Sequence, residues 1–145
     1  MRQPRIAVLG AVAFAVLAAT ACATTSDMNA ASGVKLAGAQ EVPAVTSMAS
    51  GSGSIMVAAD HSVSGSVTTT GIEGKAAHIH QAASGMNGPV IVPLTKTGDA
   101  TWSVPAGAKL TDDQYTSYQA GNMYVNVHSA ANPGGEIRGQ LNAKN

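Results

Sequence analysis

Short segments in which apolar and polar residues alternate constrain the fold of this chain more than any other feature. Such alternation is typical of a β-strand with one buried face. The 145 residues include 16 Gly and 6 Pro, which favour turns between strands. We expect strands at 34–37, 54–58, 62–69, 76–81, 90–94, 100–104, 124–128 and 136–141. These eight short strands predict an all-β fold, a Greek-key β-sandwich or barrel.

One short helix, at about 111–120, is predicted to interrupt the strands. Thr111 is suited to cap its first turn, because a threonine oxygen can accept a hydrogen bond from a free backbone N–H there. Asp112 and Asp113 follow where the helix dipole favours acidic side chains. Gly121 can end the helix.

The first 21 residues have the pattern of a secretory signal peptide. Arg2 and Arg5 precede the apolar run 6–19, and the small residues 19–21 then form a cleavage signal. The run is shorter than the roughly 20 residues that a transmembrane helix needs. We therefore expect the segment to be removed and the protein to be exported from the cytoplasm.

The only cysteine of the chain, Cys22, lies directly after this signal. The segment 17–22 resembles a bacterial lipobox, whose cysteine is acylated and becomes the mature N-terminus. The alternative is simple cleavage after Ala21, which leaves a free thiol. Ala23 follows the cysteine, which favours outer-membrane delivery. We expect a periplasmic or outer-membrane lipoprotein that meets the membrane through its lipid anchor only, with 22–32 as a flexible tether.

The folded domain is expected at 33–141, with a short tail at 142–145. Composition excludes some classes of function for it. The chain has a net charge of +0 with 11% charged residues, whereas a nucleic-acid binder would show a strongly basic patch. A single cysteine is incompatible with an intramolecular disulfide framework and with a cysteine-rich zinc or iron–sulfur site.

The placement of histidines is the strongest chemical signal. His78 and His80 flank Ile79 in one predicted strand, so both face outward if Ile79 belongs to the core. His128 faces outward in a later strand by the same argument, and Arg138 does so in the last one. If these strands are neighbours, three of the four histidines converge on one outer surface.

Three imidazoles suit copper or zinc, and copper(II) binds more tightly at a given site. Three protein ligands also leave an open position for water or substrate. The alternative is that these are surface or hydrogen-bonding histidines without a metal. The fourth histidine, His61, lies in a predicted turn and is expected to be solvated. Met86 and Met123 are more typical of packing than of copper ligands, and we expect Glu136 to pair with a basic group.

Several motifs, in the same order along the chain, resemble the CHRD domain family, first described in chordin. The resemblance covers about residues 33–141 and implies a β-rich module of the kind found in chordin and in bacterial exported proteins. The motifs are Gly-Ala-Gln-Glu-Val-Pro at 38–43, Ala-His-Ile-His at 77–80, Asn-Gly-Pro-Val at 87–90, Tyr-Val-Asn-Val-His at 124–128 and Asn-Pro-Gly-Gly-Glu-Ile-Arg-Gly-Gln at 132–140.

The His-x-His strand followed by Asn-Gly-Pro is also similar to the copper-binding segment of Cu/Zn superoxide dismutases. The similarity implies that His78 and His80 match paired copper ligands. It also implies that Arg138 fills the catalytic role of attracting superoxide. The bridging histidine, the zinc ligands and the disulfide cysteines of those enzymes have no counterpart here, so such an enzyme would use copper only.

Three functions follow as alternatives. The first is an exported copper lipoprotein with superoxide dismutase-like redox activity, in which His78, His80 and His128 hold the ion. The second is a copper-binding or homeostasis protein without turnover that uses the same ligands. The third is a structural or protein-interaction module of the cell envelope, in which the histidines are structural.

Overall fold

The computed structural model describes residues 32–143. The predicted signal peptide, Cys22 and almost all of the predicted tether lie outside these residues. Within the described range, no helix combines the length and the apolar character needed to cross a bilayer.

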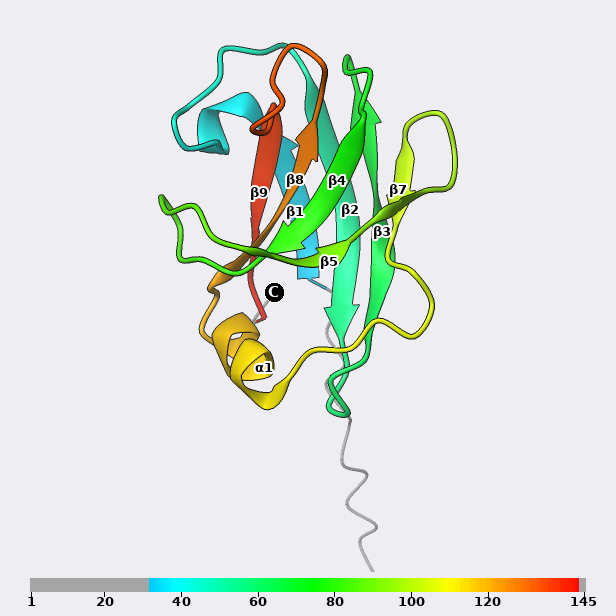
Figure 1. Ribbon diagram of the computed structural model, residues 1–145, viewed down its shortest axis with the longest axis vertical. Helices are drawn as coiled ribbons and strands as arrows, with labels where there is room; N and C mark the ends of the chain where they lie inside the picture. Colours follow the sequence, from blue (N-terminus) through cyan, green and yellow to red (C-terminus); the bar gives the residue numbers. More distant parts are fainter. Residues whose placement is uncertain (1–31, 144–145) are drawn as a thin grey trace, which may run out of the picture.

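Nine antiparallel strands of the described chain form one curled sheet (Figure 1). Their order is β5-β4-β8-β9-β1-β2-β3-β7-β6. The strands at the two ends of this order, β5 and β6, are consecutive in the chain and separated only by Leu94, so the curled sheet is a nearly closed barrel. The strands are β1 (Ser32–Ala37), β2 (Ser50–Val57), β3 (Val63–Thr70), β4 (Ala76–His80), β5 (Val90–Pro93), β6 (Thr95–Lys96), β7 (Thr101–Ser103), β8 (Met123–His128) and β9 (Ile137–Leu141).

The predicted all-β architecture is confirmed, with two differences in detail. β6 was not predicted, because a strand of two residues is too short to show alternation. β2 begins at Ser50 rather than at 54, since its first half consists of Gly and Ser and carries no apolar signal. A short 3-10 helix, η1 (Gly38–Gln40), follows β1.

The predicted helix is confirmed as α1 (Asp112–Gln119). The Thr111 hydroxyl accepts a hydrogen bond from the N–H of Gln114 at 3.2 Å, and the Gln114 side chain accepts one from the N–H of Thr111 at 2.9 Å. These two bonds satisfy backbone donors that the first helical turn leaves free. Tyr118 is buried and packs α1 against the barrel.

One apolar core fills the inside of the curled sheet. Burial of a side chain such as Ile or Leu contributes about 1.5–3 kcal/mol to folding, so this core accounts for much of the stability. Met123 belongs to it and is 1% exposed, which confirms that this methionine is a packing residue of the core. The most fully buried apolar residues are Leu36, Ile55, Val67, Ile79, Met123, Val125, Val127, Ile137 and Leu141.

The outer face of β8 and β9 is buried as well, beneath the loop 81–89. Asn87 in this loop donates a hydrogen bond from Nδ2 to the carbonyl oxygen of Val42 at 2.7 Å. Gln140 of β9 donates from Nε2 to the carbonyl oxygen of Ala82 at 2.9 Å. We call this segment the covering loop. It turns the outer side of these strands into a second buried layer, which is polar.

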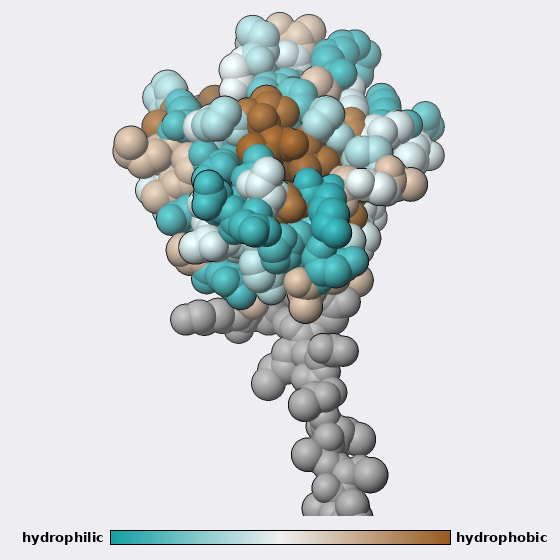
Figure 2. Space-filling model, turned by 60° about the horizontal axis from the view of Figure 1, so that its bottom comes forward, coloured by the Kyte–Doolittle hydropathy of each residue, from teal (hydrophilic) through white to brown (hydrophobic). Residues whose placement is uncertain are grey.

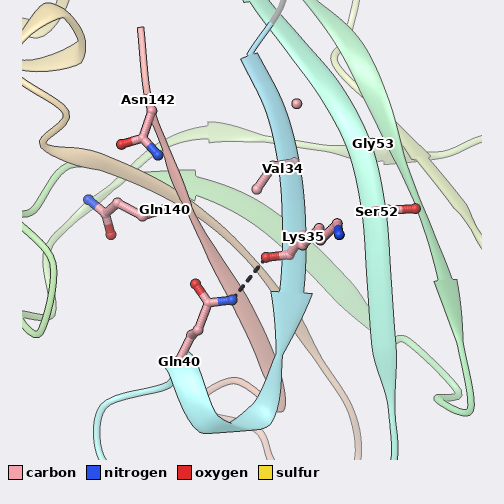
Figure 3. A pocket seen from close by; sticks show the side chains of 8 residues that line it. Val34, Lys35, Gln40, Ser52, Gly53, Gln140 and Asn142 are labelled. Atoms are coloured by element: carbon pink, nitrogen blue, oxygen red, sulfur yellow. Dashed lines mark hydrogen bonds between the residues drawn. The ribbon is translucent and has the colours of Figure 1, made fainter. Parts of the chain in front are cut away.

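Elsewhere the surface is open. A shallow groove runs along β1, β2 and β9, and Gln40 donates to the carbonyl oxygen of Lys35 at its margin, at 3.0 Å (Figure 3). Of the histidines that the structure describes, none lines this groove. Figure 2 shows a face on which polar residues surround a compact apolar area. Exposed apolar groups of limited extent are normal on soluble domains, and this area suggests no site by itself.

Candidate metal centre

Pairing between β4 and β8 brings three histidines together. The strands are antiparallel, with His78 opposite Asn126 and Ala76 opposite His128, so His78 and His128 are diagonal neighbours on one face. The Nδ1 atom of His78 lies 2.9 Å from Nε2 of His128. One ring nitrogen from each of His78, His80 and His128 lies within 4.8 Å of the others. The predicted convergence is therefore confirmed.

Backbone carbonyls fix the orientation of two of these rings. His80 Nδ1 lies 2.9 Å from the carbonyl oxygen of Gly88, and His128 Nδ1 lies 2.9 Å from that of Pro133. A carbonyl oxygen can only accept, so each Nδ1 carries a proton and the lone pair of each neutral ring is on Nε2, which in His128 accepts from Nδ1 of His78 at 2.9 Å. Histidine ligands of metals commonly have this arrangement, in which a second group holds the tautomer.

The environment of His80 Nε2 is unusual for a polar atom. His80 is 8% exposed, and no group in the described part of the chain makes a hydrogen bond to this nitrogen. An unpaired polar atom in a buried place costs about 1–3 kcal/mol. A metal ion between the three rings would satisfy it, so the residues fit such an ion.

Burial and nearby charge favour the neutral form of two of the rings, those of His78 and His80. Burial lowers the pKa of His78, and the positive charges that His128 and His80 would carry lower it further. Burial also lowers the pKa of His80, with the charges of His128 and Arg138 acting in the same direction, although hydrogen bonding to the Gly88 carbonyl and to the Asn126 side chain opposes the shift. Neutral imidazole is the form that binds metals, so the lowered pKa values of His78 and His80 are compatible with metal ligation by these two rings.

Arg138 lies on the predicted face but not at the surface. We expected an outward arginine that attracts an anion; instead it is 1% exposed beneath the covering loop. Its Nη1 donates to Asn87 Oδ1 at 3.3 Å and its Nη2 to Gln140 Oε1 at 3.3 Å. Strand alternation indicates which face a residue occupies, but it does not show that a distant loop covers that face.

An aromatic stack connects this arginine to the histidine cluster. The Tyr124 ring lies parallel to the His80 ring, with centroids 4.7 Å apart and planes 6° apart. The Cζ atom of Arg138 lies 3.4 Å from the centroid of the same Tyr124 ring. A guanidinium over an aromatic ring is attracted by the negative face of the ring. Arg138, Tyr124 and His80 therefore form a continuous stack.

A buried acid, to which the sequence patterns gave no role, completes the polar layer. Glu41 is 6% exposed; burial raises its pKa, while the nearby charge of Arg138 and a hydrogen bond from Asn126 lower it. Gly135, at φ +128°, allows this packing, because a Cβ there would lie 2.5 Å from Glu41 Oε1. Glu41 lies within the first motif of the chain, but the motif alone does not indicate burial.

The remaining candidates lie outside the cluster. His61 has φ +70° in the turn between β2 and β3, as predicted for a turn. It is only partly solvated, since its Nδ1 lies 3.3 Å from Asp112 Oδ1 and its ring stacks on Tyr115. Met86 is 61% exposed, so the expectation that it packs was wrong. The prediction that Glu136 pairs with a basic group was wrong. This carboxylate instead accepts hydrogen bonds from two serine hydroxyls, that of Ser47 at 2.7 Å and that of Ser129.

Comparison with known proteins supports the family and nothing narrower. The chain has no match among the curated proteins and none among the solved structures. The similarity to Cu/Zn superoxide dismutases therefore stays a prediction. The model of the CHRD domain matches residues 33–141, which are most of the chain and the span expected from the motifs. This protein belongs to the CHRD domain family.

Proposed function

We propose that this protein binds one copper ion through His78, His80 and His128. The observation that supports it most is the buried Nε2 of His80, which has no hydrogen-bond partner within residues 32–143 and lies close to ring nitrogens of His78 and His128. An all-nitrogen donor set suits copper(II) and zinc, and the general order of affinities favours copper. Two of the rings have their second nitrogen held by a carbonyl, which favours ligand orientation.

Redox turnover with superoxide is the second candidate. It is favoured by the partial exposure of His78 and His128, which leaves room for a small molecule beside a three-ligand ion. Bound copper would supply one-electron chemistry by alternating between Cu(II) and Cu(I). The burial of Arg138 argues against direct contact between this guanidinium and the anion. Any attraction by Arg138 acts through its field only.

We also propose that the protein is exported and anchored by acylation of Cys22. The support is the charged start, the short apolar run and the single cysteine after small residues. Mass spectrometry of the purified protein tests this directly. The expected mass is that of a chain beginning at an acylated Cys22; a mature chain that begins elsewhere or carries no acyl group would contradict it.

Copper titration against a competing chelator tests the main proposal. The titration uses a variant with the substitution Cys22→Ser, which removes the only thiol and the proposed acylation site together. One equivalent should bind, and His78→Ala should abolish that binding. His61→Ala is the matched control, because it removes the one histidine outside the cluster and should bind copper normally. Equal binding by both variants, or no binding by the parent protein, would contradict a histidine copper site and favour the interaction module.

Superoxide consumption separates binding from turnover. The copper-loaded protein should accelerate the loss of superoxide, and neither the copper-free protein nor the His78→Ala variant should do so. If the loaded protein has no effect while the titration shows one bound ion, copper binding or homeostasis without turnover is the function.

A further inference from the structure

We propose that Arg138 is the positioning residue of the metal site: it holds Tyr124 and the covering loop so that His80 presents Nε2 to the other two histidines. This inference rests on the proposed copper site. It assigns the arginine a role different from that of a surface guide for anions. Six contacts join Arg138, Tyr124, the covering loop and His80, and together they carry this role.

The first two contacts fix the plane of the His80 ring. Arg138 lies against the ring of Tyr124, with its Cζ atom 3.4 Å from the ring centroid. The His80 ring stacks parallel to the same tyrosine ring. A tyrosine that is 2% exposed between them has little freedom to move. The ring of His80 is therefore held at the angle that the guanidinium and the tyrosine impose.

The other four contacts involve the covering loop and fix the tautomer of His80. Arg138 binds the covering loop through Asn87 Oδ1 at 3.3 Å and the carbonyl oxygen of Ala83 at 3.5 Å. The same loop presents the carbonyl oxygen of Gly88 to His80 Nδ1 at 2.9 Å. Because the carbonyl can only accept, the proton stays on Nδ1 and Nε2 is free to act as a ligand. Gly88 also donates from its N–H to the Tyr124 hydroxyl at 3.3 Å, which ties the loop to the stack.

Arginine is suited to this position and lysine is not. The guanidinium is planar, so it can lie flat on a ring while its N–H groups bind acceptors at its edge. Arg138 makes both kinds of contact at 1% exposure, and the charge of the guanidinium interacts favourably with the buried Glu41 carboxyl group. A lysine ammonium would keep the charge but could not stack and reach both loop acceptors together.

Arg138→Lys in the Cys22→Ser protein tests the inference, with Lys96→Met as the matched control. Lys96 also lies over an aromatic ring, that of Trp102, at 5.7 Å, but in β6, which pairs with β7 rather than with β4 or β8. Thermal unfolding first establishes that each variant is folded. Copper affinity in Arg138→Lys should fall about 10–100-fold, the usual effect of losing a group that orients a ligand. Lys96→Met should retain the parent affinity.

Imidazole nitrogen NMR of the copper-free protein gives a readout that loss of stability alone would not change. The parent protein should show a single His80 tautomer, with the proton on Nδ1. In Arg138→Lys the two tautomers should average. An Arg138→Lys protein with the parent affinity and a single tautomer would overturn the inference.

A variant of the covering loop tests the same role without touching the arginine. If Arg138→Lys does not fold, Asn87→Ala replaces it, since Asn87 is exposed and joins Arg138 to Val42 through the loop. Asn87→Ala should lower the copper affinity, but by less than the factor of about 10–100 expected for Arg138→Lys. A variant with the copper affinity and the His80 tautomer of the parent protein would refute the inference. If the parent protein binds no copper, the proposed function fails, and the tautomer comparison alone then decides whether Arg138 positions His80.

Discussion

The outer faces of the two halves of the sheet differ in how far they are buried. Along β3, buried residues such as Val67 and Thr69 alternate with exposed ones such as Thr68 and Thr70, as expected for a strand with one solvated face. Along β8, every residue from Met123 to Val127 is buried. Both strands share the same apolar core, so the difference arises outside it, where the covering loop lies over β8 and β9.

This difference in burial determines where polar groups are left without hydrogen-bond partners. Polar groups on β3 can bind water, whereas those on β8 and β9 must find partners within the protein. Among the described residues, three of the four buried side chains that have an atom without a hydrogen-bond partner are in this layer, namely Glu41, His80 and Asn126. A buried polar layer with unsatisfied atoms beside three histidines is the arrangement expected of a binding site.

The largest expected effect is the loss of copper binding on His128→Ala. Affinity should fall by more than about 100-fold, because the change removes a ligand rather than a group that orients one. The free energy of unfolding should change by less than about 1 kcal/mol, since His128 is half-buried and outside the core. Chelator competition and urea unfolding measure the two quantities. Global unfolding of this variant would refute its placement on the outer face.

The core should respond in the same way in both halves. Ile79 in β4 is 1% exposed and Ile55 in β2 is 0% exposed, and both belong to one cluster. Truncation of either isoleucine to alanine should lower the free energy of unfolding by about 2–5 kcal/mol in urea. A large cost at only one of the two positions would show that the halves do not share a core.

The outer faces should respond differently. Asn126→Ala removes a buried amide that contacts Glu41 and should cost about 1–3 kcal/mol in urea unfolding. Thr68→Ala is the matched change on the open half, where an exposed side chain should cost no more than about 0.5 kcal/mol. Equal costs for the two variants would contradict the contrast between a covered and an open face.

The smallest expected effect depends on pH, at the margin of the covered face. Hydrogen bonds from Ser129 and Ser47 lower the pKa of Glu136 in the folded protein. The ionised carboxylate therefore stabilises the fold above the pKa of the unfolded chain, and this contribution disappears as pH falls through the lower folded value. Solvent limits its size to under about 1 kcal/mol.

Urea unfolding of the parent protein and of Glu136→Gln, compared at pH 7 and at about pH 3, measures this contribution. The difference in free energy of unfolding should be smaller at the acidic pH. A difference that grows on acidification would contradict the assigned direction of the shift.

The sequence predicted the core face well and the covered face poorly. Alternation around Ile79 and Val125 located both strands and placed the three histidines on one side, because strand periodicity is a local property. The burial of Arg138 depends on Asn87 and Ala83, which lie about fifty residues earlier in the chain. No local pattern carries such a contact, so an arginine that faces outward was expected to be solvated. The contact of Glu136 with Ser47, which lies 89 residues earlier in the chain, was missed for the same reason.

Electron paramagnetic resonance of the Cys22→Ser protein with one equivalent of Cu(II) is the most direct test of the central claim. We predict one spectrum with hyperfine structure from several imidazole nitrogens, which His80→Ala alters and His61→Ala leaves unchanged. A spectrum of free or oxygen-bound copper in the parent protein would contradict the three-histidine copper site.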